Sequence, residues 1–201
     1  RSRQRTALHH RSSSWKDGVD LLLDLGADIE AQDYQGETPL QAAVKSHKAD
    51  AVADLIRRGA KVEVSSRQAD TVLHLALLTT SNADIEPMAR IARILLAAGV
   101  PIGKAERDEV QRIGQQFEFH RARFNPEALA ATDAALATLY RLFDVPPVAA
   151  RKLHNGRDTI LVTAEGWPAQ HQQLWEWLVP SFGAAATVQG EVIRLSGRLS
   201  I

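Results

Sequence analysis

Apolar residues in the first half of the chain follow a pattern that predicts pairs of short helices. In the clearest stretch, Leu40, Ala43 and Val44 form one apolar stripe, and Val52 and Leu55 belong to a second stripe. Spacings of three and four residues place side chains on one face of a helix. We therefore expect two helices in this stretch, each with one apolar face to bury.

Short polar motifs predict where these helices begin and end. Thr38 can cap a helix by accepting hydrogen bonds from free backbone N–H groups, and Pro39 suits the first helical position, where an N–H would have no partner. Gly59 tolerates the positive φ at which many helices end. Residues 33–36, Asp-Tyr-Gln-Gly, have the composition of a turn.

This arrangement occurs three times with a period of about 33 residues. The glycines that close the second helix are 33 and 40 residues apart, at Gly26, Gly59 and Gly99. The longer gap is 33 plus 7 residues, so we expect an insertion of 7 residues within Thr79–Pro87. A regular period of this length is typical of stacked repeat proteins.

The motif and the period resemble the ankyrin repeat, with its T-P-L-H-x-A signature. Residues 38–43, Thr-Pro-Leu-Gln-Ala-Ala, match well, whereas Ala7 and Val72 replace the proline in the other two copies. Ser12–Ser14 stand where the first helix should continue, and Ala69 replaces the turn glycine. The resemblance implies an α-solenoid in which neighbouring repeats bury one another's apolar faces and leave a concave side.

The predicted domains are three ankyrin repeats over residues 1–104 and a helical C-terminal region over residues 105–201 that closes the solenoid. We expect a helix over 106–124 and a second one starting at Pro126. This pair could be a fourth repeat that has lost its signature, because terminal repeats are atypical. The fold class is therefore mainly α.

Further along, Thr159–Val162 is a β-prone run too short to form a sheet alone. We expect a helix over 168–178, ended by Pro180, and another over 184–199. In the second of these, the alternation of apolar and polar residues at Val192–Arg194 is also compatible with a strand. The run from Phe117 to Leu199 also resembles the tails of certain bacterial ankyrin proteins.

The composition of the chain argues against several classes of function. The 201 residues carry 24 basic and 24 acidic side chains, so the net charge is zero, which argues against a nucleic-acid binder. No apolar run reaches the roughly 20 residues needed to cross a bilayer, so we expect no membrane contact. The sequence shows no signal peptide, so we expect a cytoplasmic protein. The lack of cysteine excludes disulfides, thiolate metal sites and cysteine nucleophiles.

The chemistry-bearing residues favour structural roles over catalysis. In ankyrin repeats the histidine of the motif bonds the backbone of a neighbouring finger loop, which is the role we expect for His9 and His74, with Gln41 able to donate the same bond. His120, His154 and His171 lack a second ligand four residues on, and nucleophile and phosphate-binding motifs are absent. We therefore predict no enzyme, cofactor or metal.

An enzyme in the C-terminal region is the alternative. Its candidate groups are Glu118, His120, His154 and Glu191. An active site needs such groups to converge in one concave pocket. The position of these four side chains therefore discriminates between the two hypotheses.

The residues left free by the stack are the candidate binding site. Ankyrin proteins contact partners with their finger tips and with the exposed edge of the inner helices, and the register carries this role to Tyr34, Gln35, Glu37, Lys45, Ser46, Arg67, Gln68, Asp70, Leu78 and Thr79. The first finger adds Arg1, Arg3 and Arg5. Tyr34 and Arg67 are the best anchors by residue type. The alternative is that these are ordinary solvated loops.

Together these patterns predict a non-enzymatic module that binds one protein partner. By analogy with small bacterial ankyrin proteins that accompany secreted toxins, including type VI secretion effectors, the chain could be an immunity protein. A third hypothesis is that the C-terminal region makes the main contact and the repeats only support it. The oligomeric state is left open.

Overall fold

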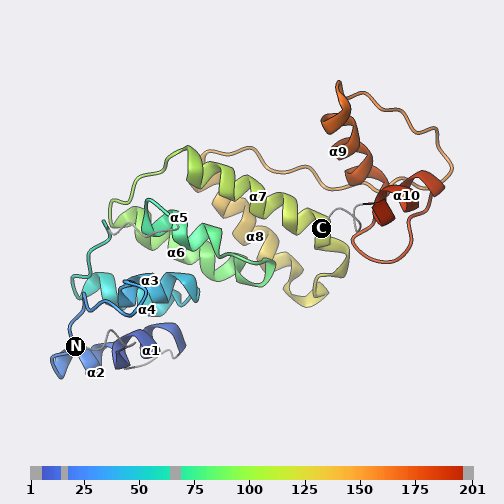
Figure 1. Ribbon diagram of the computed structural model, residues 1–201. Helices are drawn as coiled ribbons and strands as arrows, with labels where there is room; N and C mark the ends of the chain where they lie inside the picture. Colours follow the sequence, from blue (N-terminus) through green and yellow to red (C-terminus); the bar gives the residue numbers. More distant parts are fainter. Residues whose placement is uncertain (1–5, 15–17, 64–68, 197–201) are drawn as a thin grey trace. The chain divides into compact units, whose positions relative to one another are not determined.

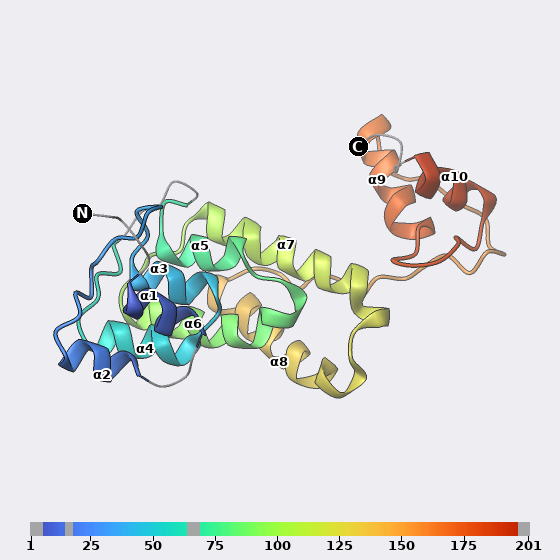
Figure 2. The same ribbon diagram turned by 60° about the horizontal axis from the view of Figure 1, so that its bottom comes forward.

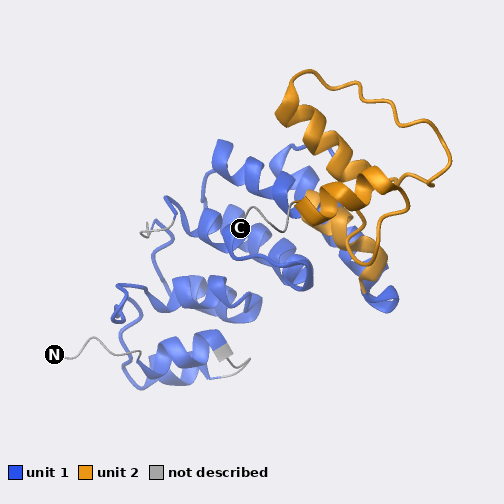
Figure 3. Ribbon diagram, turned by 45° about the vertical axis from the view of Figure 1, so that its right-hand side comes forward, with its two compact units in different colours: residues 1–114, 125–147 blue, residues 115–124, 148–201 orange. Residues whose placement is uncertain are grey.

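The computed structural model describes residues 6–14, 18–63 and 69–196, and these residues form helices and no strand. The chain divides into two compact units (Figure 3). Unit 1 contains residues 1–114 and 125–147, and unit 2 contains residues 115–124 and 148–201. The predicted fold class, a mainly α protein with stacked helix pairs, is confirmed.

Three helix pairs begin unit 1. Their bounds are α1 Ala7–Ser14, α2 Val19–Asp24, α3 Pro39–Lys45, α4 Ala49–Arg57, α5 Val72–Leu78 and α6 Ile85–Ala97. The first helix of each pair packs in one row, with α3 between α1 and α5, and the second helices pack in another, with α4 between α2 and α6 (Figures 1 and 2). The expected insertion contains a short 3₁₀ turn, η1 (Asn82–Asp84), which leads into α6.

Side-chain caps set the starts of the inner helices. The Thr38 hydroxyl accepts from the Gln41 N–H at 3.3 Å, and the Gln41 carboxamide oxygen accepts from the Thr38 N–H at 2.8 Å. This reciprocal pair satisfies two N–H groups that the helix leaves open. The Thr71 hydroxyl also caps α5, accepting from the His74 N–H at 2.9 Å, without the reciprocal bond. The predicted cap at Thr38 is confirmed.

Stacking buries the apolar stripes that the sequence predicts. Leu40, Ala43 and Val44 of α3 and Val52 and Leu55 of α4 are all at most 1 % exposed. Full burial of a leucine or valine side chain contributes roughly 1.5–3 kcal/mol. Because α3 contacts an inner helix on either side, each repeat obtains this burial from its neighbours.

Imidazole hydrogen bonds join neighbouring repeats, as predicted for His9. The His9 ring is buried, and its Nε2 donates to the Glu37 carbonyl at 2.7 Å while Nδ1 bonds the Thr6 hydroxyl at 2.8 Å. His74 differs from the prediction, because it makes no such bond within the described residues and its Nδ1 is buried without a partner. The Thr71 hydroxyl, which corresponds to the Thr6 hydroxyl bonded to Nδ1 of His9, donates to Glu106 instead.

Glu106 therefore connects the third repeat to the helix that follows it. The side chain is buried, with one carboxylate oxygen 2.7 Å from the Thr71 hydroxyl and the other 2.9 Å from the Gly103 N–H. Burial by itself raises the pKa of Glu106, but these hydrogen bonds, one from its own backbone N–H and the nearby His74 together hold the pKa below its ordinary value.

The next helices differ slightly from the predicted bounds. Helix α7 covers Lys104–His120 and is followed by a 3₁₀ turn, η2 (Arg121–Arg123), rather than continuing to residue 124. Helix α8 (Pro126–Phe143) packs on α6 and so continues the row of second helices. Its buried face includes Leu136, Leu139 and Phe143.

Unit 2 is built around two further helices, α9 (Trp167–Leu178) and α10 (Val188–Ser196), which pack against each other. A Cβ on Gly190 would lie 2.7 Å from the Leu178 carbonyl oxygen, so this contact requires glycine. The predicted helix over 184–199 begins only at Val188, after Thr187 accepts from the Gly190 N–H, and residues beyond 196 lie outside the described part.

His47 occupies a second junction between repeats. It follows α3 with a φ of 52°, is 7 % exposed, and places Nε2 3.0 Å from the Thr80 hydroxyl. The Ala76 carbonyl lies 3.3 Å from the same nitrogen, and an Asp84 carboxylate oxygen lies 3.9 Å from Nδ1. Burial lowers the pKa of His47 and outweighs the opposing effects of Asp84 and the Ala76 carbonyl.

We expect acid to destabilise the repeats through His47. As the pH falls below the ordinary histidine pKa of about 6.5, the unfolded chain binds a proton that the folded chain resists, so the free energy of unfolding decreases. The His47→Asn variant keeps a residue that tolerates a positive φ at this position. Its free energy of unfolding should be about 1–3 kcal/mol lower at pH 8 and should change less with pH. Urea unfolding followed by circular dichroism between pH 8 and pH 5 tests this, and equal pH slopes for both proteins would contradict it.

Candidate functional site

The site is built on the finger loop at residues 33–37, whose tip is a tight hydrogen-bonded turn. The Asp33 N–H donates to the Glu37 carbonyl at 3.0 Å, and the Gly36 N–H donates to the Asp33 carbonyl at 3.0 Å. A carboxylate oxygen of Asp33 accepts from the N–H groups of Gln35 and Glu37 at 2.8 and 3.0 Å. Because Gly36 has a φ of 81°, glycine suits this position.

This turn presents Tyr34 and Gln35 to the surroundings. Tyr34 is 66 % exposed, and Gln35 is exposed beside it. Tyrosine combines a large apolar ring with a polar hydroxyl and is enriched among residues that dominate binding energy. A side chain on a rigid turn loses less conformational freedom when it is bound. The tip therefore has the properties of a preformed protein contact.

Glu37 and Lys45 lie at the base of the finger and form an ion pair. The Lys45 Nζ is 2.7 Å from a Glu37 carboxylate oxygen. Lys45 is half-buried, whereas Glu37 is only 7 % exposed, although we expected it on the exposed edge. The difference arises because the Glu37 backbone is held by Asp33 and His9, which directs the residue toward the end of α3.

The other predicted residues are dispersed along the ends of the inner helices. Ser46 is half-buried at the C-cap of α3, and Asp70 is exposed before α5. Leu78 is 38 % exposed at the end of α5, whereas the Thr79 hydroxyl donates to backbone carbonyls of that helix. The remaining predicted residues lie outside the described part of the chain: Arg67, Gln68, Arg1, Arg3 and Arg5.

The sequence pattern did not single out Glu30, which links the start of the finger at residues 33–37 to the next repeat. Its carboxylate accepts from the Lys61 N–H at 2.8 Å, and its own N–H donates to Asp28 at 2.9 Å. The only signal was the related position of Glu30 and Glu63 after the repeated glycines. The Glu30–Lys61 bond thus holds the start of the finger, whereas the Asp33 turn holds its tip.

The side chains of the enzyme alternative do not converge. Glu118 accepts from Arg121 and lines a hollow in unit 2, whereas His154 lines a separate, smaller hollow. Glu191 pairs with Arg194, and His120 packs edge-on against Phe119. Within the described residues no group of three histidine or acidic side chains is placed to hold a metal ion. The geometry therefore gives this alternative no support.

Comparisons with known proteins agree with the repeat pattern. Residues 6–56 match the family model described as ankyrin repeats (many copies). Over 105 residues the chain is 39 % identical to a transient receptor potential cation channel subfamily A member 1 homolog of Caenorhabditis elegans. This alignment covers 52 % of the chain but only 8 % of that protein, so the chain spans a small part of the relative's length.

Among solved structures, the human ASB11 ankyrin repeat domain aligns with a TM-score of 0.37 and 14 % identity. The alignment covers 65 % of this chain and 84 % of that one. The family-model match at residues 6–56 and the stacked, threonine-capped helix pairs support ankyrin repeats in this part of the chain. Ankyrin repeats indicate a protein–protein interaction module. No helix in the described ranges has the length and apolar character to cross a membrane.

We expect the finger to depend on the Asp33 carboxylate. Asp33→Ala removes the acceptor of two backbone N–H groups and should lower the free energy of unfolding by about 1–3 kcal/mol, whereas Asp33→Asn keeps an acceptor oxygen and should lose less. Urea unfolding monitored by circular dichroism measures both. If the two variants were equally stable, the proposed role of this carboxylate would be wrong.

Proposed function

We propose that the chain is a non-enzymatic module that binds one protein partner through its finger tips and the adjacent ends of the inner helices. The observation that carries this proposal is the preformed turn, which holds Tyr34 66 % exposed on a hydrogen-bonded loop. An exposed aromatic side chain on a rigid support suits a binding surface better than a solvated loop.

The charges on the second helices support this choice of surface. They pair with one another across repeats, in the pairs Arg57–Asp20, Arg58–Asp24 and Arg90–Asp50. Exposed pairs of this kind contribute little stability, about 0–1 kcal/mol each. They do, however, pair these six side chains with one another within the chain. The finger side instead offers Tyr34 and Gln35, and Leu78 at the end of α5.

The register of the repeats supports the extension of the site beyond one finger. Lys45 and Leu78 are 33 residues apart and hold corresponding positions at the ends of α3 and α5, which pack together. By its place in the repeat sequence, Arg67 is proposed as a further contact residue of the third copy. A partner that spans two repeats would then contact a tyrosine, an arginine and an apolar leucine, which together make a typical interface composition.

A narrower form of the proposal concerns the class of partner. The resemblance of residues 117–199 to the tails of bacterial ankyrin proteins supports a role as a cytoplasmic immunity protein that neutralises a secreted toxin, such as a type VI effector. A neutral chain with both charge signs on its surface suits one specific protein better than a nucleic acid. This narrower form depends on the binding surface proposed above.

The test is affinity purification of the partner from the native host, followed by calorimetry with single variants. Tyr34→Ala and Arg67→Ala should each weaken binding at least tenfold, which corresponds to about 1.4 kcal/mol. Lys48→Ala, an exposed change in the turn between α3 and α4, should leave the affinity unchanged. If both variants kept full affinity, the proposed binding surface would be wrong. If the partner were not a secreted toxin, only the proposed role as an immunity protein would be wrong.

A further inference from the structure

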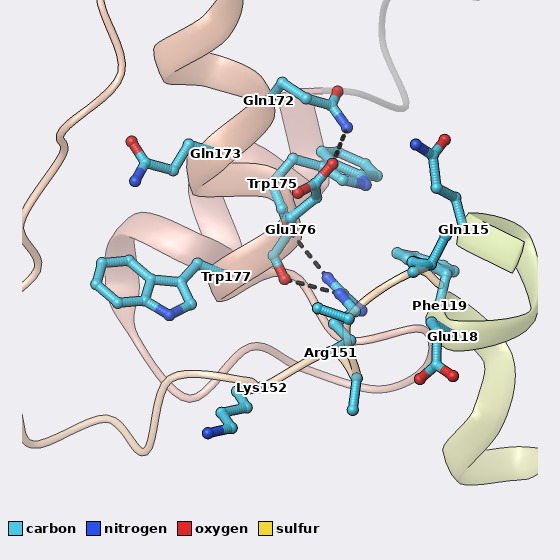
Figure 4. Close-up of a pocket in the computed structure, with 13 residues that line it drawn as sticks. Gln115, Glu118, Phe119, Arg151, Lys152, Gln172, Gln173, Trp175, Glu176 and Trp177 are labelled. Carbon is cyan, nitrogen blue, oxygen red and sulfur yellow. Dashed lines mark hydrogen bonds between the residues drawn. The ribbon is translucent and has the colours of Figure 1, made fainter. Parts of the chain in front are cut away.

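Unit 2 contains a hollow of about 690 Å³ that the finger site does not use. Three stretches surround it: the end of α7, residues 148–152, and the second half of α9 (Figure 4). Its size lies within the range of typical ligand-binding clefts, about 300–1,000 Å³. The lining residues show what kind of ligand it suits.

One side of the hollow is a backbone segment with unused hydrogen-bonding groups. Residues 148–152 are neither helix nor strand, and within the described chain none of their backbone N–H or C=O groups takes part in a backbone hydrogen bond. Ala149 and Ala150 are exposed and have small side chains, so another polypeptide could approach closely. Backbone groups of this kind need a partner whenever they are removed from water.

Arg151 holds this segment in place. Its guanidinium donates to the carbonyls of Glu176 and Trp175 at 2.7 and 3.0 Å, near the end of α9, and lies 4.4 Å from the centre of the Phe119 ring. The side chain thus fixes the segment while the peptide groups stay accessible. A prearranged backbone lowers the entropic cost of binding.

The other sides offer amide and aromatic groups, together with the charged side chains of Glu118, Glu176 and Lys152. Gln115 and Gln172 can bond peptide groups, and the partly exposed rings of Trp175 and Trp177 can contact apolar side chains. The Glu118 carboxylate is paired with Arg121. Charges of both signs, amide groups and aromatic rings suit a polypeptide better than a phosphate or a nucleic acid.

We propose that this hollow is a second binding site, which takes an extended peptide segment of a protein partner. The peptide pairs with the backbone of residues 148–152 as an added strand, and its alternate side chains lie against Phe119, Trp175 and Trp177. Strand addition of this kind obtains affinity from main-chain hydrogen bonds and specificity from side-chain pockets. This site is independent of the finger tip.

The experiment selects peptides from a random seven-residue display library with the full chain and measures their affinity by calorimetry. Selected peptides are resynthesised in two forms, N-methylated at their odd or at their even residues, and one form should bind at least tenfold more weakly, because the added strand loses its donors. One of the two variants Ala149→Pro and Ala150→Pro should weaken the unmodified peptides similarly, because successive N–H groups of a strand point to opposite edges. The matched change Ala184→Pro, in an exposed loop position of the same unit, and Tyr34→Ala should have no effect.

Several outcomes would overturn the proposal. These are a library that yields no enriched peptide, N-methylated peptides that bind as well as the originals, and peptides that bind both proline variants unchanged. A small apolar molecule that occupies the hollow while peptides do not would also overturn it. Far-UV circular dichroism identifies a proline variant that fails to fold, and the N-methylated peptides then still decide the question on the unmodified chain.

Discussion

The structure of the repeats depends on the burial of apolar helix faces between neighbours. Leu40 and Val44 in α3 and Leu73 in α5 are at most 1 % exposed, although each belongs to a helix of only seven residues. Helices of this length are not stable in isolation. They persist because α3 packs between α1 and α5, so the stability of one repeat is a property shared with the repeats beside it.

Polar contacts then set the register of the stacked helices. His9 bonds a carbonyl of the next finger, His47 bonds the Thr80 hydroxyl just after the inner helix of the next repeat, and Glu106 accepts from the Thr71 hydroxyl that caps α5. A misplaced repeat would leave these buried groups unpaired, at a cost of about 1–3 kcal/mol each. The finger tips are therefore held by the same contacts that fix the stack.

The local parts of this arrangement could be predicted from sequence. Thr38, Pro39 and Gly59 act locally at the ends of their own helices, and the spacing of about 33 residues between the equivalent threonines and glycines identifies the repeats. Long-range contacts could not be predicted in this way. The burial of Glu37 depends on Lys45 and His9. Glu106 bonds a threonine that stands 35 residues earlier. The β-prone run at 159–162 has no partner strand in the described chain, so its propensity is not expressed.

The most direct test of the central claim is native-state hydrogen exchange after a cavity is made in one repeat. Leu73→Ala in α5 should cost about 2–5 kcal/mol and should lower the protection of amides in α3 as well as in α5, because the two helices share one buried face. If α3 kept its full protection while α5 lost its own, the repeats would not depend on stacking, and the account would be contradicted.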